Sequence, residues 1–173
     1  MNYIYCYESP LGGMTLASDG ENLIGLWFDD QKFFGRFLDR KPLKKDLPVF
    51  EETIRWLNDY FKGKNPDFVP RLAPRGTAFQ KEVWDILLTI PRGKTMTYGD
   101  IAGVLAKRKG IAKMSAQAVG AAVGHNPISL IIPCHRVVGK RGQLTGYAGG
   151  LDRKEKLLLL EKQDLIPFLD GDV

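Results

Sequence analysis

The chain has 173 residues, a hydrophobic content of 44% and a formal net charge of +5. No apolar run approaches the length that spans a membrane, and the N-terminus lacks the basic start and apolar core of a signal peptide. Its two cysteines are too few for a disulfide framework, which fits a reducing compartment. We therefore expect a cytoplasmic protein, bacterial or archaeal, or a nuclear one in a eukaryote, with no membrane contact.

The positive charge is concentrated in the C-terminal part of the chain. Residues 1–74 contain 10 Lys and Arg against 11 Asp and Glu, whereas residues 75–173 contain 15 against 9. A basic segment of this kind favours an anionic partner, and nucleic acid is the first candidate. Ordinary solvated lysines are the alternative explanation.

Short strands and one helix are predicted in the N-terminal part. Residues 2–8, 14–17 and 23–28 are β-prone runs separated by turn sequences, which is typical of an antiparallel meander. Residues 49–62 repeat apolar side chains at helical spacing and end before a glycine. We predict a small α/β support domain over residues 1–70, with no catalytic group.

The following residues predict a mainly helical domain. After a linker at residues 71–76, Thr77 and Thr97 each begin a capping-box pattern that starts a helix. Helix, turn and helix within one basic domain are typical of DNA binding, although helical hairpins are also common in cores. The expected fold is a two-domain α/β protein whose C-terminal domain, residues 77–173, contains a helix-turn-helix. Its helices are predicted at residues 77–90, 98–106 and 115–123, with a basic turn at 107–110.

The third of these helices is composed almost entirely of small residues. Its one long polar side chain is Gln117. A helix that reads the major groove usually presents Arg, Asn or Gln to the base edges, so this helix is better suited to a close backbone approach in a minor groove. Tight packing in the core explains the same composition equally well.

A thiol, an imidazole and a guanidinium follow one another at Cys134, His135 and Arg136. Residues 129–132 are apolar and β-prone, so we predict a buried strand that ends at Pro133 and places the thiol beside a rigid element. A thiol attacks as its thiolate, and a nearby imidazole and positive charge can lower its pKa. The pattern indicates a nucleophilic cysteine.

Two other interpretations of the cysteine are possible. An arbitrary cysteine is more often a small buried hydrophobic residue than a nucleophile. A metal site would need further ligands, but Cys6, Cys134, His125 and His135 do not have the spacing of a zinc motif. We expect no metal and no cofactor.

The segment after the cysteine is rich in glycine. Residues 139–150 lack the spacing of phosphate-binding and dinucleotide-binding loops. They are better suited to form a wall that approaches a flat ligand closely. A final helix is predicted from about Asp152, and Glu161 lies near its C-terminal end, where an anion is unfavourable for the helix dipole and suggests a partner.

Several motifs together resemble one family. Residues 132–137 read Ile-Pro-Cys-His-Arg-Val, preceded by Asn126-Pro127 and followed by Tyr147-x-Gly-Gly-Leu and Lys154. Upstream matches occur at residues 9–12, 79–84 and 97–102. This set closely resembles the methylated-DNA–protein-cysteine methyltransferases, which repair O6-alkylguanine in DNA, and the resemblance covers almost the whole chain.

The resemblance implies a role for each catalytic residue. Cys134 would accept the alkyl group, and His135 would act through a water molecule as the base that holds the thiolate. Glu161 would orient His135, and Arg136 would be a structural ion-pair partner. Tyr98 would donate to the leaving guanine and stabilise its developing charge.

The resemblance also implies the residues that bind the base and the DNA. The carbonyl groups of Cys134 and Val137 would hold the exocyclic amine of the base, and the N–H group of Ala148 would face its O6 atom. Asn126 would brace the turn before the cysteine, while Tyr147 and Gly149 would shape the pocket. The expected DNA-binding residues are Thr97, Lys107, Arg108, Lys109, Ala116, Gln117, Gly120 and Ala121.

The implied activity is direct DNA repair. A monomer would bind duplex DNA through the minor groove, extrude the damaged nucleotide and transfer an alkyl group irreversibly from O6 of guanine, less readily from O4 of thymine, to Cys134. The main alternative is a sensor of alkylated DNA with the same fold but no enzymatic activity. A helix-turn-helix regulator or a cysteine hydrolase fits the third helix and the glycine-rich segment less well.

The chain departs from the family pattern at two places. The family usually has an arginine in the third helix that enters the base stack, and here that position is Gln117. Compared with the family that the chain resembles, the turn at residues 107–113 is about five residues longer than usual, and it contains four cations. We expect these cations to bind phosphates and partly offset the loss of the arginine.

Overall fold

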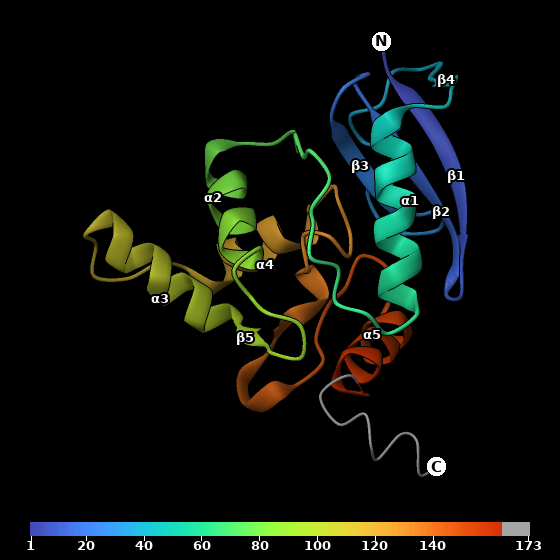
Figure 1. Ribbon diagram of the computed structural model, residues 1–173. Helices are drawn as coiled ribbons and strands as arrows, with labels where there is room; N and C mark the ends of the chain where they lie inside the picture. Colours follow the sequence, from blue (N-terminus) through green and yellow to red (C-terminus); the bar gives the residue numbers. More distant parts are fainter. Residues whose placement is uncertain (164–173) are drawn as a thin grey trace.

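A computed structural model describes residues 1–163 of the protein, with a sheet in the N-terminal half and helices in the C-terminal half (Figure 1). Strands β1 (Tyr3–Ser9), β2 (Gly12–Ser18) and β3 (Leu23–Phe28) form the predicted antiparallel meander. Strand β4 (Leu43–Lys44) extends the sheet to the order β3-β2-β1-β4 by pairing in parallel with β1. The sequence did not predict β4, because two exposed residues show no alternation.

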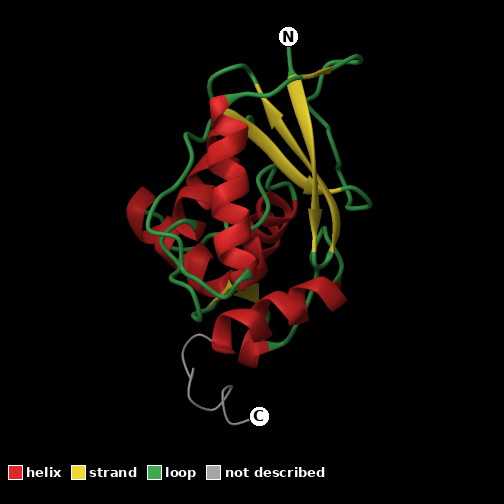
Figure 2. Cartoon of the chain, turned by 45° about the vertical axis from the view of Figure 1, so that its right-hand side comes forward, coloured by secondary structure: helices red, strands yellow, loops and turns green. Residues whose placement is uncertain are grey.

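Helix α1 (Pro48–Phe61) crosses one face of this sheet, as Figure 2 shows. A proline suits the first turn of a helix because its missing N–H group would have no partner there. The predicted apolar stripe is confirmed. Its inner face buries Val49, Phe50, Thr53, Trp56, Leu57 and Tyr60.

Four further helices, α2 (Ala78–Leu87), α3 (Tyr98–Lys109), α4 (Ala116–Gly124) and α5 (Leu151–Gln163), make up most of the C-terminal half. Thr77 and Thr97 form complete capping boxes, as predicted from their spacing. The predicted fold class is confirmed. The last part of the predicted C-terminal domain, residues 164–173, lies outside the described residues.

The predicted basic turn at residues 107–110 is wrong in part. Lys107, Arg108 and Lys109 form the last turn of α3, which ends at Gly110 in the left-handed conformation, with φ of +66°. Cations at a helix C-terminus interact favourably with the helix dipole, which explains why the helix continues through them.

The predicted strand at residues 129–132 is also wrong. The chain makes one parallel bridge to β3, where the Ser129 N–H group donates to the Leu26 carbonyl at 2.9 Å. It then turns at Leu130, whose φ of +69° is incompatible with a strand. The run is apolar because it is buried on every side, and burial alone does not distinguish a strand from a compact turn.

The turn leads into a short 3-10 helix, Cys134–Arg136, and then into strand β6 (Val137–Val138). Strand β6 pairs in parallel with β5 (Met96–Thr97), which directly precedes α3. The cysteine and the start of α3 are therefore held beside each other.

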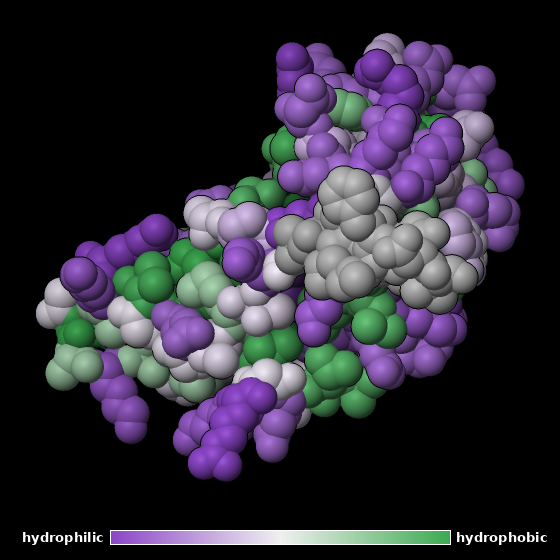
Figure 3. Space-filling view, turned by 60° about the horizontal axis from the view of Figure 1, so that its bottom comes forward, coloured by the Kyte–Doolittle hydropathy of each residue, from purple (hydrophilic) through white to green (hydrophobic). Residues whose placement is uncertain are grey.

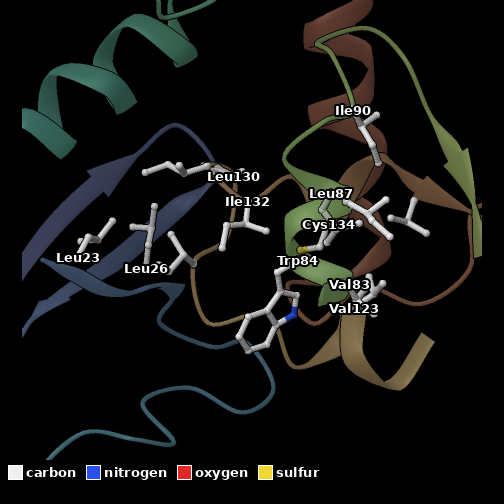
Figure 4. Close-up of a cluster of buried hydrophobic side chains, with 14 of the residues drawn as sticks. Leu23, Leu26, Val83, Trp84, Leu87, Ile90, Val123, Leu130, Ile132 and Cys134 are labelled. Carbon is white, nitrogen blue, oxygen red and sulfur yellow. The ribbon is translucent and has the colours of Figure 1, made fainter. Parts of the chain in front are cut away.

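The largest buried cluster takes side chains from both halves of the chain. Figure 4 shows Leu23 and Leu26 of the sheet on one side, and Cys134 close to Trp84 and Leu87 of α2 on the other. The division into two domains at residues 71–76 stays a prediction. No helix among residues 1–163 is long and apolar enough to cross a membrane.

Candidate active site

Cys134 lies at the start of the 3-10 helix and is 5% exposed. Burial raises the pKa of its thiol, and the Asn126 side chain and the Lys154 ammonium oppose this only in part. The sequence predicted that neighbouring groups lower this pKa, but desolvation outweighs them. The resting thiol is therefore neutral near pH 7 and needs a base before it can attack.

His135 is suited to act as this base, because one of its ring nitrogens has a hydrogen-bond partner and the other has none among residues 1–163. Its Nε2 atom contacts the Glu161 carboxylate, whereas its Nδ1 atom is buried with no hydrogen-bond partner among residues 1–163. Burial lowers the pKa of His135, although Glu161 opposes the shift, so the imidazole is neutral. The contact assigns the proton to Nε2, which leaves a lone pair at Nδ1 to accept a proton.

Glu161 is the centre of a buried polar cluster. It accepts a hydrogen bond from the Arg136 Nε atom at 2.7 Å, and Arg136 also donates to the Ile90 carbonyl at 2.7 Å. Burial alone would raise the pKa of Glu161, but His135 and Arg136 hold it well below its ordinary value. The carboxylate therefore stays ionised and fixes the orientation of His135.

Tyr60 completes this cluster, and the sequence analysis missed it. Its buried hydroxyl group donates to the Glu161 carboxylate at 2.6 Å and lies 3.5 Å from the His135 Nε2 atom. Tyr60 belongs to α1, far from His135 in the chain, and occupies one position of an ordinary apolar stripe. No local pattern distinguishes it from a core residue.

Replacing Tyr60 by Phe is expected to slow any reaction that uses His135 and to lower stability. A lost hydrogen bond to a charged group costs about 1.5–3 kcal/mol of stability. If about 1.4 kcal/mol of this loss also raises the activation free energy of the reaction, the rate falls about tenfold. Single-turnover kinetics and urea unfolding measure the two effects. Tyr7→Phe is the control, since its hydroxyl group donates to Asn58 away from Cys134. Equal rates in the two variants would contradict the prediction.

A cavity of about 230 Å³ opens at Cys134. Five residues predicted for the site line it, and five that the sequence did not indicate line it as well. The first group is Tyr98, Gly120, Cys134, Tyr147 and Ala148, and the second is Lys32, Phe33, Val123, Gly124 and Gly146.

Three other predicted pocket residues lie behind its lining. Val137 is buried in β6, and Gly149 packs so closely on Tyr147 and Phe28 that a Cβ atom would come within 2.7 Å of the Tyr147 ring. The Asn126 side chain donates to the Ile132 carbonyl at 2.8 Å and accepts from the Ile128 N–H group at 3.0 Å. Asn126 thus links the two ends of the turn that precedes Cys134.

A buried lysine holds the glycine-rich segment against the pocket. The Lys154 ammonium group donates to the Thr145 and Gly146 carbonyls at 3.1 and 3.0 Å, and burial lowers its pKa to about 8. The Tyr98 hydroxyl group donates to the same Thr145 carbonyl at 3.0 Å. Burial raises the pKa of Tyr98, so this hydroxyl stays protonated and able to donate.

The residues predicted to bind DNA lie on α3, α4 and the strand before them. Figure 3 shows that this part of the molecule projects from the body, with hydrophilic and hydrophobic side chains mixed on its surface. The Thr97 hydroxyl group is engaged in the α3 cap, and Lys109 pairs with Glu82 of α2 at 3.0 Å. The exposed members are Lys107, Arg108, Lys109, Ala116, Gln117 and Ala121, whereas Gly120 is half-buried.

Comparisons with known proteins match nearly the whole chain. Residues 2–74 match the family model described as 6-O-methylguanine DNA methyltransferase, ribonuclease-like domain, and residues 78–163 match the DNA binding domain of the same name. A methylated-DNA–protein-cysteine methyltransferase of Mycobacterium tuberculosis is 45% identical over 155 residues, 90% of this chain and 89% of the relative. One of Methanosarcina acetivorans is 42% identical over 165 residues, 92% and 97% of the two chains.

A solved structure is similar throughout. The crystal structure of Mycobacterium tuberculosis OGT in complex with DNA superposes with a TM-score of 0.80 at 44% identity, covering 94% of each chain.

Proposed function

Because this chain belongs to the 6-O-methylguanine DNA methyltransferase family, whose members are DNA-repair transferases, we propose that it moves a methyl or larger alkyl group from O6 of guanine in duplex DNA to the sulfur of Cys134. Transfer from O4 of thymine would be slower. The observation that carries the proposal is the cavity at Cys134, whose next residue in the chain is His135, with a buried Nδ1 atom that has no hydrogen-bond partner among residues 1–163.

The proposed transfer uses Cys134, His135 and Tyr98 together with one water molecule. The Cys134 proton passes to the Nδ1 atom of His135, through a water molecule, and the thiolate attacks the alkyl carbon. A sulfur–carbon bond forms while the bond from carbon to O6 breaks, and the electron pair stays on guanine. The Tyr98 O–H group would leave the Thr145 carbonyl and donate its hydrogen bond to this developing anion.

The product is stable, which makes the reaction a single turnover. The alkyl group of the thioether would leave Cys134 only if another nucleophile attacked its carbon and released the thiolate. The other cysteine of the chain, Cys6, lies in β1 and does not line the cavity. Each molecule would therefore repair one lesion.

We propose that a monomer binds the minor groove through α4. The small side chains of this helix allow the backbone to approach the duplex closely, and the damaged nucleotide must leave the stack to reach the buried thiol. The matched structure of a relative in complex with DNA supports DNA as the ligand. The helix offers little for reading base edges, so binding would be largely independent of sequence.

Intact mass and peptide mapping test the proposal. The protein is mixed with a duplex that contains one O6-methylguanine, and we expect one methyl group on the peptide that contains Cys134, at a stoichiometry of one. Cys134→Ser and an undamaged duplex are the controls, and neither should give a mass gain. Tight binding to the lesion without any mass gain would overturn the proposal and favour a sensor of alkylated DNA.

Gln117→Arg is expected to increase both lesion binding and the repair rate. An arginine side chain is longer and charged, so it can occupy the space that the extruded nucleotide leaves and stabilise the flipped state. Fluorescence anisotropy and single-turnover kinetics on the same lesion duplex measure the two quantities. Unchanged values would show that this position does not limit extrusion.

Neutralising Lys107, Arg108 and Lys109 together, with Gln at each position, is expected to weaken DNA binding for all sequences alike. Each lost phosphate contact reduces the slope of log K against log salt concentration by about 0.9. Anisotropy titrations across a series of salt concentrations give that slope. Lys109 already pairs with Glu82, so we expect a change below that of three full contacts. An unchanged slope would exclude these cations from the interface.

A further inference from the structure

The segment between β3 and β4 contributes to the pocket although it belongs to the sheet half of the chain. Lys32 and Phe33 line the same cavity as Cys134. The Lys32 N–H group donates to the Ala148 carbonyl at 3.1 Å, which joins this segment to the glycine-rich wall. Two separate parts of the chain therefore meet over the thiol.

A buried glutamine anchors this segment. The Gln31 Oε1 atom accepts from the Phe28 N–H group at 2.9 Å and from the Ser129 hydroxyl group at 3.2 Å. Ser129 lies in the turn that leads to Cys134. The backbone just before Phe33 is thus tied through Gln31 to the turn that leads to Cys134, and through Lys32 to the glycine-rich segment.

Phe33 itself has an unusual conformation. Its φ is +62°, in the left-handed region that a bulky residue rarely adopts, and its side chain is 47% exposed. The ring stacks on the His125 imidazole, at 4.1 Å between centroids and 25° between planes, directly after α4. Residues held in strained backbone conformations cluster at active sites and ligand-binding sites, so this conformation suggests a functional role for Phe33.

We propose that Phe33 forms a wall of the pocket that packs against the extruded O6-alkylguanine. The inference rests on the proposed function. A flat base that has left the stack loses its neighbours, and an aromatic side chain replaces part of that contact. Phe33 lines the cavity together with Tyr98 and Tyr147, so a purine that enters toward Cys134 would meet aromatic residues from both halves of the chain.

Alkyl transfer from a free base separates this role from DNA binding. The probes are free O6-benzylguanine and a duplex that contains O6-methylguanine, and the readout is the second-order rate of modification of Cys134 by mass spectrometry. For Phe33→Ala we expect both rates to fall about tenfold, the size of one base–aromatic contact. The affinity for an undamaged duplex should stay unchanged.

Phe34→Ala is the matched control. Phe34 is the next residue, is 39% exposed, contacts Trp27 and does not line the cavity. The rates at which the two probes alkylate Cys134 in Phe34→Ala should equal those of the protein without substitutions. Phe33→Gly removes the backbone strain, so it should be as slow as Phe33→Ala while its melting temperature is no lower than that of Phe34→Ala.

Each other outcome overturns the inference. An unchanged rate with free O6-benzylguanine in Phe33→Ala shows that the ring does not contact the base. Weaker binding of undamaged duplex with an unchanged free-base rate assigns Phe33 to the DNA backbone. If neither probe alkylates Cys134 of the protein without substitutions, the proposed function itself is overturned, and this inference with it.

Discussion

Replacing Glu161 by Gln is expected to reduce alkyl transfer by at least about a hundredfold and stability by about 3–5 kcal/mol, the cost of breaking a buried ion pair. Tyr60, His135 and Arg136 all direct donors at this carboxylate. An amide offers one acceptor atom and presents its own N–H groups to the remaining donors. The Arg136 charge then stays buried without its counterion, and the His135 ring loses the group that orients it.

The stability effect depends on pH in a defined direction. The pKa of Glu161 lies well below its ordinary value of 4.5, so its ionised form adds stability above that value, and this contribution is lost as the pH falls below it. We expect the difference in unfolding free energy between Glu161→Gln and the unmodified protein to be larger near pH 7 than at about pH 3. Urea unfolding at the two pH values measures the change.

Glu155→Gln is the control for this substitution. Glu155 lies on the same helix and is exposed, so its change should alter neither the transfer rate nor the stability. Glu161→Asp keeps the charge but shortens the side chain, and its transfer rate should lie between the rates of Glu161→Gln and Glu155→Gln. Transfer by Glu161→Gln at the unmodified rate would exclude the carboxylate from the reaction.

Replacing Asn126 by Ala is expected to give the second largest effect. The Ile128 N–H group loses its acceptor, and such a buried unsatisfied group costs about 1–3 kcal/mol. The Ile132 carbonyl loses one donor, worth about 0.5–1.5 kcal/mol, but keeps the Cys134 N–H group at 2.8 Å, so we expect a loss of about 1.5–4.5 kcal/mol in total. The same turn places Cys134, and a shift of about 1 Å at a reacting atom can slow a reaction about a hundredfold. Thermal unfolding and single-turnover transfer measure the two losses.

Two further variants separate the brace from a general effect. Asn65→Ala removes an exposed asparagine and should change neither quantity. Asn126→Asp keeps the acceptor for the Ile128 N–H group but buries a carboxylate against the Ile132 carbonyl, so we expect a stability no higher than that of Asn126→Ala near pH 7. Normal stability and rate in Asn126→Ala would show that the turn holds its geometry without this side chain.

Local chemistry explains why the helices were predicted well. The capping boxes at Thr77 and Thr97 involve residues only three positions apart, so the pattern contains all the partners that form the structure. The same holds for the strands of the meander, which are separated by short turns. The strand predicted at residues 129–132 was wrong because a turn that is buried from several sides has the same apolar run as a buried strand.

The adjacency of Cys134, His135 and Arg136, and the motifs around them, were sufficient for the sequence to indicate the chemistry and the family. The sequence did not indicate that Tyr60, Lys32 and Phe33 lie at the site, because these residues come from the N-terminal half of the chain and belong to no local motif. It also suggested an activated thiol, whereas burial raises the pKa of Cys134. Contacts between distant segments and the desolvation of buried groups arise only when the chain is folded, so the tertiary structure alone decided them.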